Sequence, residues 1–292
     1  MTELQQGVGT SPLIVVHASA GTVFEYRKLV EAFDDSIPVI GIQSPGFGAK
    51  DAIPESIDRL AQHYVEDLSE ISRLDECRLI GWSFGGVVAF ELASALRDHG
   101  LQVDHLCLLD AFHPSLRREM ANTRGFSVLR EFVVNVGRTA GLSPAAFEAL
   151  TDLLETEDDD TRILEKLASH LETMGGPTER RADRTFLEQL FTIYRTHMQA
   201  YDDYHPKPTD VPTTVVAAKE TGSSHQNLPG WRGWKSLIEA PKQQVSVEAG
   251  HYQLLQPPAL KKIIGYCSMF SHNRRHESRS KGRGTSFTGE EE

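Results

Sequence analysis

The sequence predicts an α/β protein built on a mostly parallel, doubly wound sheet. In the first 110 or so residues, short and continuously apolar runs alternate with stretches of helical periodicity. Continuous apolar runs are typical of strands that are buried on both faces. Strand signals stop near residue 115 and return near residue 211. Because parallel strands must be joined by crossovers, usually helices, the alternation implies a sheet covered by helices on both sides.

The first half of the chain follows the order strand, helix, strand. We expect strands over 13–16, 38–42, 78–80 and 105–109, and helices over 22–33, 57–68 and 87–96. The second helix has apolar residues at helical spacing, and Gly100 is placed to end the third. Small residues, His17 to Gly21, follow the first strand, and Asp110 follows the fourth. Ligands of such folds bind at the carboxyl ends of the strands, where these residues fall.

From about 115 to 204 only helical patterns remain. Ser143 and Pro144 form a helix start, and the Gly-Gly-Pro sequence at 175–177 is a break. We interpret this stretch as a helical lid inserted over the carboxyl edge of the sheet. The alternative, ordinary helices packed on the sheet, stays open.

Strand signals return over 211–218 and 244–248, and a closing helix is expected over 259–270. We therefore expect one α/β domain over residues 1–270 with the lid at about 115–204. The tail, 271–292, has almost no apolar residues and is expected to be disordered.

Composition excludes several functions. The net charge of −11 argues against nucleic acid and anionic membranes as partners. No apolar run approaches the roughly 20 residues of a membrane span. The N-terminus lacks the pattern of a signal peptide, and the three cysteines (Cys77, Cys107 and Cys267) are odd in number, so buried free thiols and a cytoplasmic location are expected. No cysteine and histidine spacing suggests a metal site.

The most informative stretch is Gly81-Trp-Ser-Phe-Gly85, a G-x-S-x-G pentapeptide between an apolar run and a helix rich in small residues. In a nucleophile elbow the chain turns sharply from strand to helix and lifts the serine hydroxyl above the sheet. The residues two before and two after the serine must be tiny, because their side chains would collide across the turn. Gly81 and Gly85 meet that need.

A serine hydroxyl needs a neutral imidazole to take its proton and a carboxylate to orient that imidazole. We assign Ser83 as nucleophile, Asp110 as orienting acid and His251 as general base, because His251 alone lies on a glycine-led loop after the last strand. The order serine, aspartate, histidine fits the α/β-hydrolase fold. The backbone N–H groups of Phe84 and Ala20 are our candidates for the oxyanion hole.

Four segments resemble the thioesterase domains of non-ribosomal peptide synthetases and polyketide synthases. They are His17-Ala-Ser-Ala-Gly21, Gly81-Trp-Ser-Phe-Gly-Gly86, Leu108-Leu-Asp-Ala111 and Gly250-His-Tyr-Gln-Leu-Leu255. The resemblance covers about 13–270. It implies an enzyme that takes an acyl or peptidyl chain from a carrier protein onto Ser83 as an ester, then releases an acid or a ring. The phosphopantetheine arm belongs to the carrier, so no cofactor of the chain's own is implied.

The position of Asp110 resembles that of chain-terminating domains; in the separate editing thioesterases the acid lies after the next strand. Here Glu220 is the alternative at that later place. An acyl-CoA or editing thioesterase, a small-molecule esterase or acyltransferase, and an inactive binding module remain rival interpretations. Only twelve residues precede the first strand, so the chain is expected to be an excised domain or a free-standing enzyme that acts in trans.

Two further features stay open. Trp231 and Trp234 either line an acyl pocket or simply pack. A set of arginines near the start of the lid is a candidate docking surface for an acidic carrier protein: Arg117, Arg118, Arg124 and Arg130.

Overall fold

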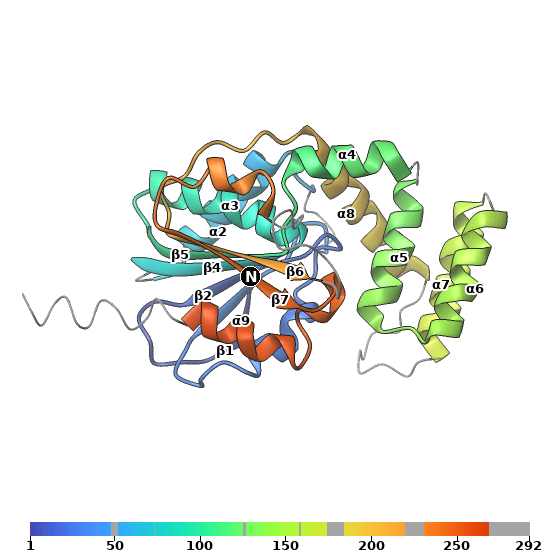
Figure 1. Ribbon diagram of the computed structural model, residues 1–292, viewed down its shortest axis with the longest axis horizontal. Coiled ribbons are helices and arrows are strands. Elements are labelled where there is room, and N and C mark those ends of the chain that lie inside the picture. The colour runs from blue at the N-terminus through green and yellow to red at the C-terminus, as the bar shows by residue number, and fades with distance from the viewer. Residues whose placement is uncertain are drawn as a thin grey trace, which may run out of the picture.

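The computed structural model describes residues 1–47, 52–72, 74–124, 127–157, 159–173, 184–219 and 231–268. Its sheet has seven strands in the order β1-β3-β2-β4-β5-β6-β7 (Figure 1). The strands are β1 (Thr2–Gln5), β2 (Leu13–Val16), β3 (Val39–Ile42), β4 (Glu76–Trp82), β5 (Gln102–Leu109), β6 (Thr213–Lys219) and β7 (Lys242–Glu248). From β3 to β7 every neighbouring pair is parallel, which confirms the predicted fold class.

The edge strand β1 was not predicted. It pairs with β3 in the antiparallel sense, and its residues are exposed or half-buried. Its sequence is short and mostly polar, so it lacks the continuous apolar run that marks the other strands. Leu4 packs against β3, since a Cβ added to Gly41 of that strand would lie 2.8 Å from Cδ1 of Leu4.

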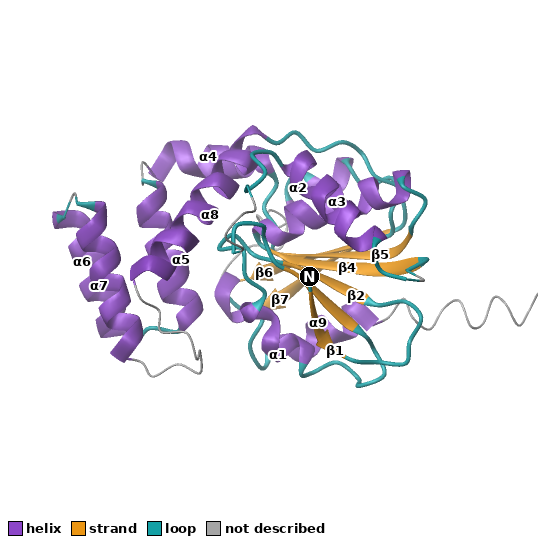
Figure 2. Cartoon of the chain, turned by 180° about the vertical axis from the view of Figure 1, so that it is seen from behind, coloured by secondary structure: helices purple, strands orange, loops and turns teal. Residues whose placement is uncertain are grey.

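Helices cover both faces of the sheet (Figures 1 and 2). In the described residues, the helices outside the predicted lid region are η1 (Phe24–Tyr26), α1 (Arg27–Val30), α2 (Ile57–Ser69), α3 (Phe84–Asp98), η4 (Trp234–Ser236), η5 (His251–Gln253) and α9 (Ala259–Ser268). Within β2, Ile14 and Val16 pack in one cluster with α2 and α3. Leu13 and Val15 pack in the other, with α1 and α9. Two buried faces explain why β2 reads as a continuous apolar run.

The helix predicted over 22–33 is much shorter in the structure. Only Phe24 to Val30 is helical, and the chain then continues through Phe33 in turns with hydrogen bonds between residues three apart. Asp34 follows, and its carboxylate accepts the N–H of Ser36 at 2.9 Å. Aspartate and serine favour such local turns over continued helix, which explains the early end.

In its described residues the predicted lid region forms five helices, which we call the cap: α4 (Pro114–Arg124), α5 (Val128–Ala140), α6 (Pro144–Thr156), α7 (Asp160–Thr173) and α8 (Arg184–Asp203). The cap lies at one end of the sheet rather than over either face, with α6 and α7 farthest from the strands (Figure 1). The helix start predicted at Ser143 is present, because its hydroxyl accepts the N–H of Ala146 at 3.3 Å. The predicted break at 175–177 and the tail lie outside the described residues.

Topology brings the predicted site residues to one edge. β3 lies on one side of β2 and β4 on the other, so the chain changes direction across the sheet between these central strands. Loops at the carboxyl ends on either side of such a point separate and leave a crevice. The predicted site residues follow four of the parallel strands and lie at this edge. Ala20 follows β2, Ser83 follows β4, Asp110 follows β5 and His251 follows β7.

Candidate active site

Ser83 occupies the sharp turn predicted between β4 and α3. Its φ and ψ angles are 57° and −127°, a conformation that L residues rarely adopt. A Cβ on Gly81 would overlap the carbonyl group of Gly85, and one on Gly85 would lie 2.5 Å from the carbonyl oxygens of Val16 and His17. The two glycines therefore allow the elbow to close against itself and against the end of β2. The sharp turn brings Ser83 to the cavity between the sheet and the cap.

A buried tyrosine holds the base of this turn. Tyr26 donates its hydroxyl to the carbonyl oxygen of Val16 at 2.8 Å and accepts the N–H of Trp82 at 2.6 Å. It thus bridges β2 and β4 just where the two strands end. Sequence reasoning missed this role, because an aromatic residue in a short helix gave no sign of a hydrogen-bonding partner.

Asp110 and His251 meet although 141 residues separate them. Nδ1 of His251 lies 2.7 Å from Oδ2 of Asp110, and Oδ1 of Asp110 accepts the N–H of Ala218 at 2.9 Å. An ionised carboxylate can only accept hydrogen bonds, so Nδ1 donates and the neutral ring carries its lone pair on Nε2. Asp110 itself is buried and has a positive φ of 46°, which turns its carboxylate into the site.

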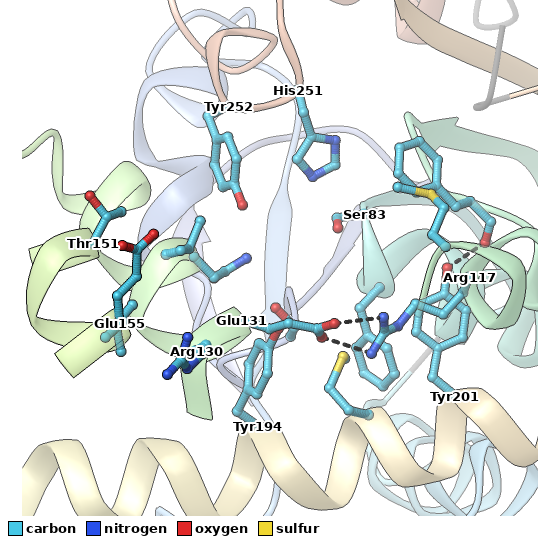
Figure 3. A pocket seen from close by; sticks show the side chains of 18 residues that line it. Ser83, Arg117, Arg130, Glu131, Thr151, Glu155, Tyr194, Tyr201, His251 and Tyr252 are labelled. Carbon is cyan, nitrogen blue, oxygen red and sulfur yellow. Dashed lines mark hydrogen bonds and ion pairs between the residues drawn. The ribbon is translucent and has the colours of Figure 1, made fainter. Parts of the chain in front are cut away.

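Aromatic side chains fix the imidazole plane. The Trp82 ring lies 4.9 Å from that of His251, and its Nε1 donates to the His251 carbonyl oxygen at 3.2 Å. Phe112 and Tyr252 contact the same ring, with centroids 5.7 and 5.0 Å away. The ring is therefore packed on several sides while its edge faces the cavity with Ser83 (Figure 3).

The two predicted oxyanion donors lie on separate elements at this edge. Phe84 opens α3, so its N–H has no carbonyl group one turn earlier to bond. Ala20 lies in a loop that is closed by a hydrogen bond of 2.9 Å from the N–H of Gly21 to the carbonyl oxygen of Ala18. In the described part of the chain neither donor N–H has a hydrogen-bond acceptor. Both are available to a negatively charged oxygen.

A cavity of about 490 Å³ joins Ser83 and His251 to the cap. This volume is in the range of pockets for small ligands. Its wall near Ser83 is aromatic, with Phe84, Phe112 and Tyr252. Its cap side mixes polar and apolar side chains: Arg117, Met120, Arg130, Glu131, Val134, Asn135, Thr151, Leu154, Glu155, Tyr194, Met198 and Tyr201. Figure 3 shows Glu131, Tyr194 and Thr151 around the open space.

A bidentate ion pair braces the cap beside the cavity. Nη1 and Nη2 of Arg117 on α4 lie 3.0 and 2.7 Å from the two carboxylate oxygens of Glu131 on α5. The parallel geometry of guanidinium and carboxylate makes such pairs strong and directional. Arg118 is also engaged, donating to the carbonyl oxygen of Asp202 at 2.6 Å. Arg117 and Arg118 are thus tied to other parts of the cap, and Arg117 and Arg130 line the cavity. The side chain of Arg124 lies outside the described residues, and the docking surface stays a prediction.

The tryptophan pair packs rather than lining the cavity. Trp234 is fully buried and donates Nε1 to the carbonyl oxygen of Ala111 at 2.6 Å. Trp231 donates Nε1 to the carbonyl oxygen of Val245 at 3.0 Å. Neither is among the residues that line the cavity. The alternative acid, Glu220, lies outside the described residues.

The described ranges hold no group of three or more histidine, cysteine or acidic side chains arranged to bind a metal ion. In the same ranges no helix has the length and apolar character needed to cross a membrane. Cys77, Cys107 and Cys267 are buried free thiols, as the sequence predicted.

Comparisons with known proteins agree on one family. The family model for the thioesterase domain matches residues 11–270. The thioesterase PytI of Aspergillus terreus is 30% identical over 216 residues, which cover 68% of each chain. A dimodular non-ribosomal peptide synthase of Bacillus subtilis is 23% identical over 261 residues, which cover 86% of this chain and 10% of the synthase.

Among solved structures, a four-domain non-ribosomal peptide synthetase bound to AMP and glycine has a TM-score of 0.75 at 22% identity. The alignment covers 92% of this chain and 20% of that synthetase. The chain thus spans only a small part of the synthetases it matches. The likeness of this structure shows the fold, and the sequence matches show the family. The chain belongs to the thioesterase domain family.

Proposed function

We propose that this domain releases an acyl or peptidyl chain from the phosphopantetheine thiol of a carrier protein through an ester on Ser83. The observation that carries the proposal is the 2.7 Å contact between His251 and Asp110 at a cavity that also contains the strained Ser83. The sequence relatives, which include a peptide synthase and a thioesterase, support a role in the biosynthesis of natural products.

The chemistry proceeds in two halves. Ser83 Oγ attacks the thioester carbonyl carbon while Nε2 of His251 takes the hydroxyl proton. The N–H groups of Ala20 and Phe84 stabilise the tetrahedral oxyanion, and Asp110 stabilises the imidazolium. The carbon–sulfur bond then breaks, and the imidazolium returns the proton to the departing thiolate.

In the second half a water molecule, or a hydroxyl or amine at the far end of the chain, attacks the ester. Nε2 of His251 takes the proton of this nucleophile and delivers it to Ser83 Oγ as the ester breaks. Water gives a free acid, and an internal nucleophile gives a ring. The protein needs no cofactor of its own, because the thiol arm arrives with the substrate.

The test uses a panel of acyl and peptidyl N-acetylcysteamine thioesters, together with the same chains loaded on a carrier protein. Liquid chromatography and mass spectrometry then separate acid from ring. We expect turnover that disappears in Ser83→Ala. Absence of turnover with every carrier-loaded and free thioester, together with hydrolysis of simple oxygen esters, would favour the rival esterase activity.

Carrier-bound substrate also distinguishes the release role from editing. An editing enzyme prefers short aberrant acyl groups, whereas a release enzyme prefers the full-length chain. The cavity of about 490 Å³ holds only part of a long peptidyl chain, so the remainder would extend along the cap. We therefore expect kcat/KM to be higher for full-length chains than for acetyl groups.

A further inference from the structure

A buried histidine on α8 contacts the backbone beside one proposed oxyanion donor, Ala20, and the side chain of the other, Phe84. His197 is fully buried, and its Nδ1 lies 2.8 Å from the carbonyl oxygen of Ser19. Its ring stacks on that of Phe84, with centroids 4.7 Å apart and planes 19° apart. Tyr194 and Tyr201 of the same helix line the cavity (Figure 3), whereas His197 contacts the loop after β2.

The protonation state of His197 follows from its partners. A carbonyl oxygen only accepts, so Nδ1 carries the hydrogen and donates to Ser19. Nε2 faces the hydroxyl of Ser44 at 3.0 Å, and the ring lies 4.9 Å from that of His17. Burial, with a smaller effect from His17, lowers the pKa of His197 well below its ordinary value. The ring is therefore neutral and acts as a fixed donor.

This hydrogen bond sets the direction of a proposed catalytic N–H. The carbonyl group of Ser19 and the N–H of Ala20 belong to one peptide unit, which is trans. In a planar trans peptide the two groups point in opposite directions. Holding the oxygen towards α8 therefore directs the N–H of Ala20 away from that helix. Hydrogen bonding at the oxygen also polarises the amide and strengthens its N–H as a donor.

Packing makes the loop and the helix one unit. Gly21 has a φ of 82°, and a Cβ added to it would lie 2.8 Å from Cγ2 of Ile193. Ile193 precedes His197 by one helical turn, so the two side chains contact the loop side by side. A shift of α8 would move the Ser19–Ala20 peptide with it.

We propose that His197 is a positioning residue for the oxyanion hole, which links the cap helix α8 to the strength of transition-state binding. The inference rests on the proposed function, because it assumes that Ala20 and Phe84 bind the oxyanion. It predicts that a shift of the cap helix α8 alters kcat, and that the hydrogen bond from His197 to Ser19 carries part of this effect.

Two variants separate the hydrogen bond from the packing. His197→Phe keeps an aromatic ring against Phe84 but has no donor for Ser19. His197→Asn keeps an N–H donor near the position of Nδ1 but has no ring. Loss of an oxyanion donor costs about 10² to 10³ in kcat. A misdirected donor should cost less, so we expect His197→Phe to lower kcat about 10- to 100-fold on an N-acetylcysteamine thioester, with KM changed less than about threefold.

His197→Asn should retain at least about ten times the kcat of His197→Phe. A trifluoromethyl ketone, which forms a tetrahedral adduct with Ser83, should bind His197→Phe more weakly by the same factor as the loss in kcat/KM. The matched control is His105→Phe. His105 is also buried and lies 3.0 Å from a hydroxyl, that of Thr214, but it is on β5, away from the cavity. His105→Phe should lower the melting temperature without lowering kcat.

The kinetics of the His197 variants can contradict the positioning role in two ways. Equal kcat in wild type and His197→Phe would overturn the proposal, as would equal losses in His197→Phe and His197→Asn that follow their loss of melting temperature. If the wild type turns over no thioester and Ser83→Ala changes nothing, the proposed function fails and this inference fails with it. Wild-type turnover that depends on Ser83, combined with an insensitive His197, would refute the positioning role alone.

Discussion

Replacing Asp110 by asparagine tests how the site orients its imidazole. The carboxylate of Asp110 has two fixed partners, the N–H of Ala218 at 2.9 Å and Nδ1 of His251 at 2.7 Å. The Ala218 N–H needs an acceptor, so the amide oxygen of the introduced asparagine would face it. The amide NH₂ would then face Nδ1 and force that nitrogen to accept. The proton would move to Nε2, where it blocks transfer from Ser83.

The magnitude follows from this change of tautomer. Holding the base in the wrong tautomer costs about 10⁴-fold in kcat in a triad of this kind. That factor corresponds to about 5 kcal/mol of transition-state stabilisation, at about 1.4 kcal/mol for each factor of ten. Binding of the thioester should change little, because Asp110 is buried behind His251 and does not line the cavity.

The assay is thiol release from an N-acetylcysteamine thioester, followed with a thiol reagent at saturating substrate. Asp104→Asn provides the matched control, since Asp104 lies on β5 near the opposite end of the same strand. We expect it to keep wild-type kcat. A fall of less than about tenfold in Asp110→Asn would refute the tautomer argument, and would direct attention to Glu220 as the working acid.

Two further changes test the scaffold around the site. Gly85→Ala would place a methyl group 2.5 Å from the carbonyl oxygens of Val16 and His17, so we expect the free energy of unfolding, measured with guanidinium, to fall by about 3 kcal/mol. The control is Gly265→Ala, which lies in a helix and has nothing within 4 Å of the new atom. It should be neutral or raise the free energy of unfolding by up to about 1 kcal/mol. Equal effects of the two substitutions would contradict the close approach at the elbow. Burial lowers the pKa of His105 from an ordinary 6.5 to about 4, so the unfolded state takes up the proton at a higher pH than the folded state. As pH falls from 6.5 to 4, the free energy of unfolding of the wild type should therefore fall relative to that of His105→Phe by about 3 kcal/mol. A difference between wild type and His105→Phe that is constant over this range would show that His105 is not buried in the neutral form.

Sequence patterns predicted the central strands of the sheet well because these strands are buried on both faces. Leu13 to Val16 reads as one apolar run for this reason, and Gly81 and Gly85 mark the elbow because no other residue fits there. The polar edge strand β1 gave no such signal. Its pairing depends on the exposed backbone of β3, which the local sequence of β1 does not reveal.

The meeting of Asp110 and His251 was predictable because strand order determines it. The cap was predictable only as a set of helices. The bidentate pair of Arg117 and Glu131 joins two helices, and its geometry depends on how α4 and α5 cross, which helical periodicity does not specify. His197 could have been noticed as a histidine on an otherwise apolar helix face, but its partner, the Ser19 carbonyl oxygen, is a backbone atom 178 residues away.

The proposed mechanism requires the hydroxyl of Ser83 to form a covalent bond with the acyl group. Intact-protein mass spectrometry after incubation with a fluorophosphonate measures this most directly, followed by peptide mapping. We expect one adduct per chain, located on the peptide that contains Ser83, and none in Ser83→Ala. An adduct on another residue, or labelling that persists in Ser83→Ala, would contradict it.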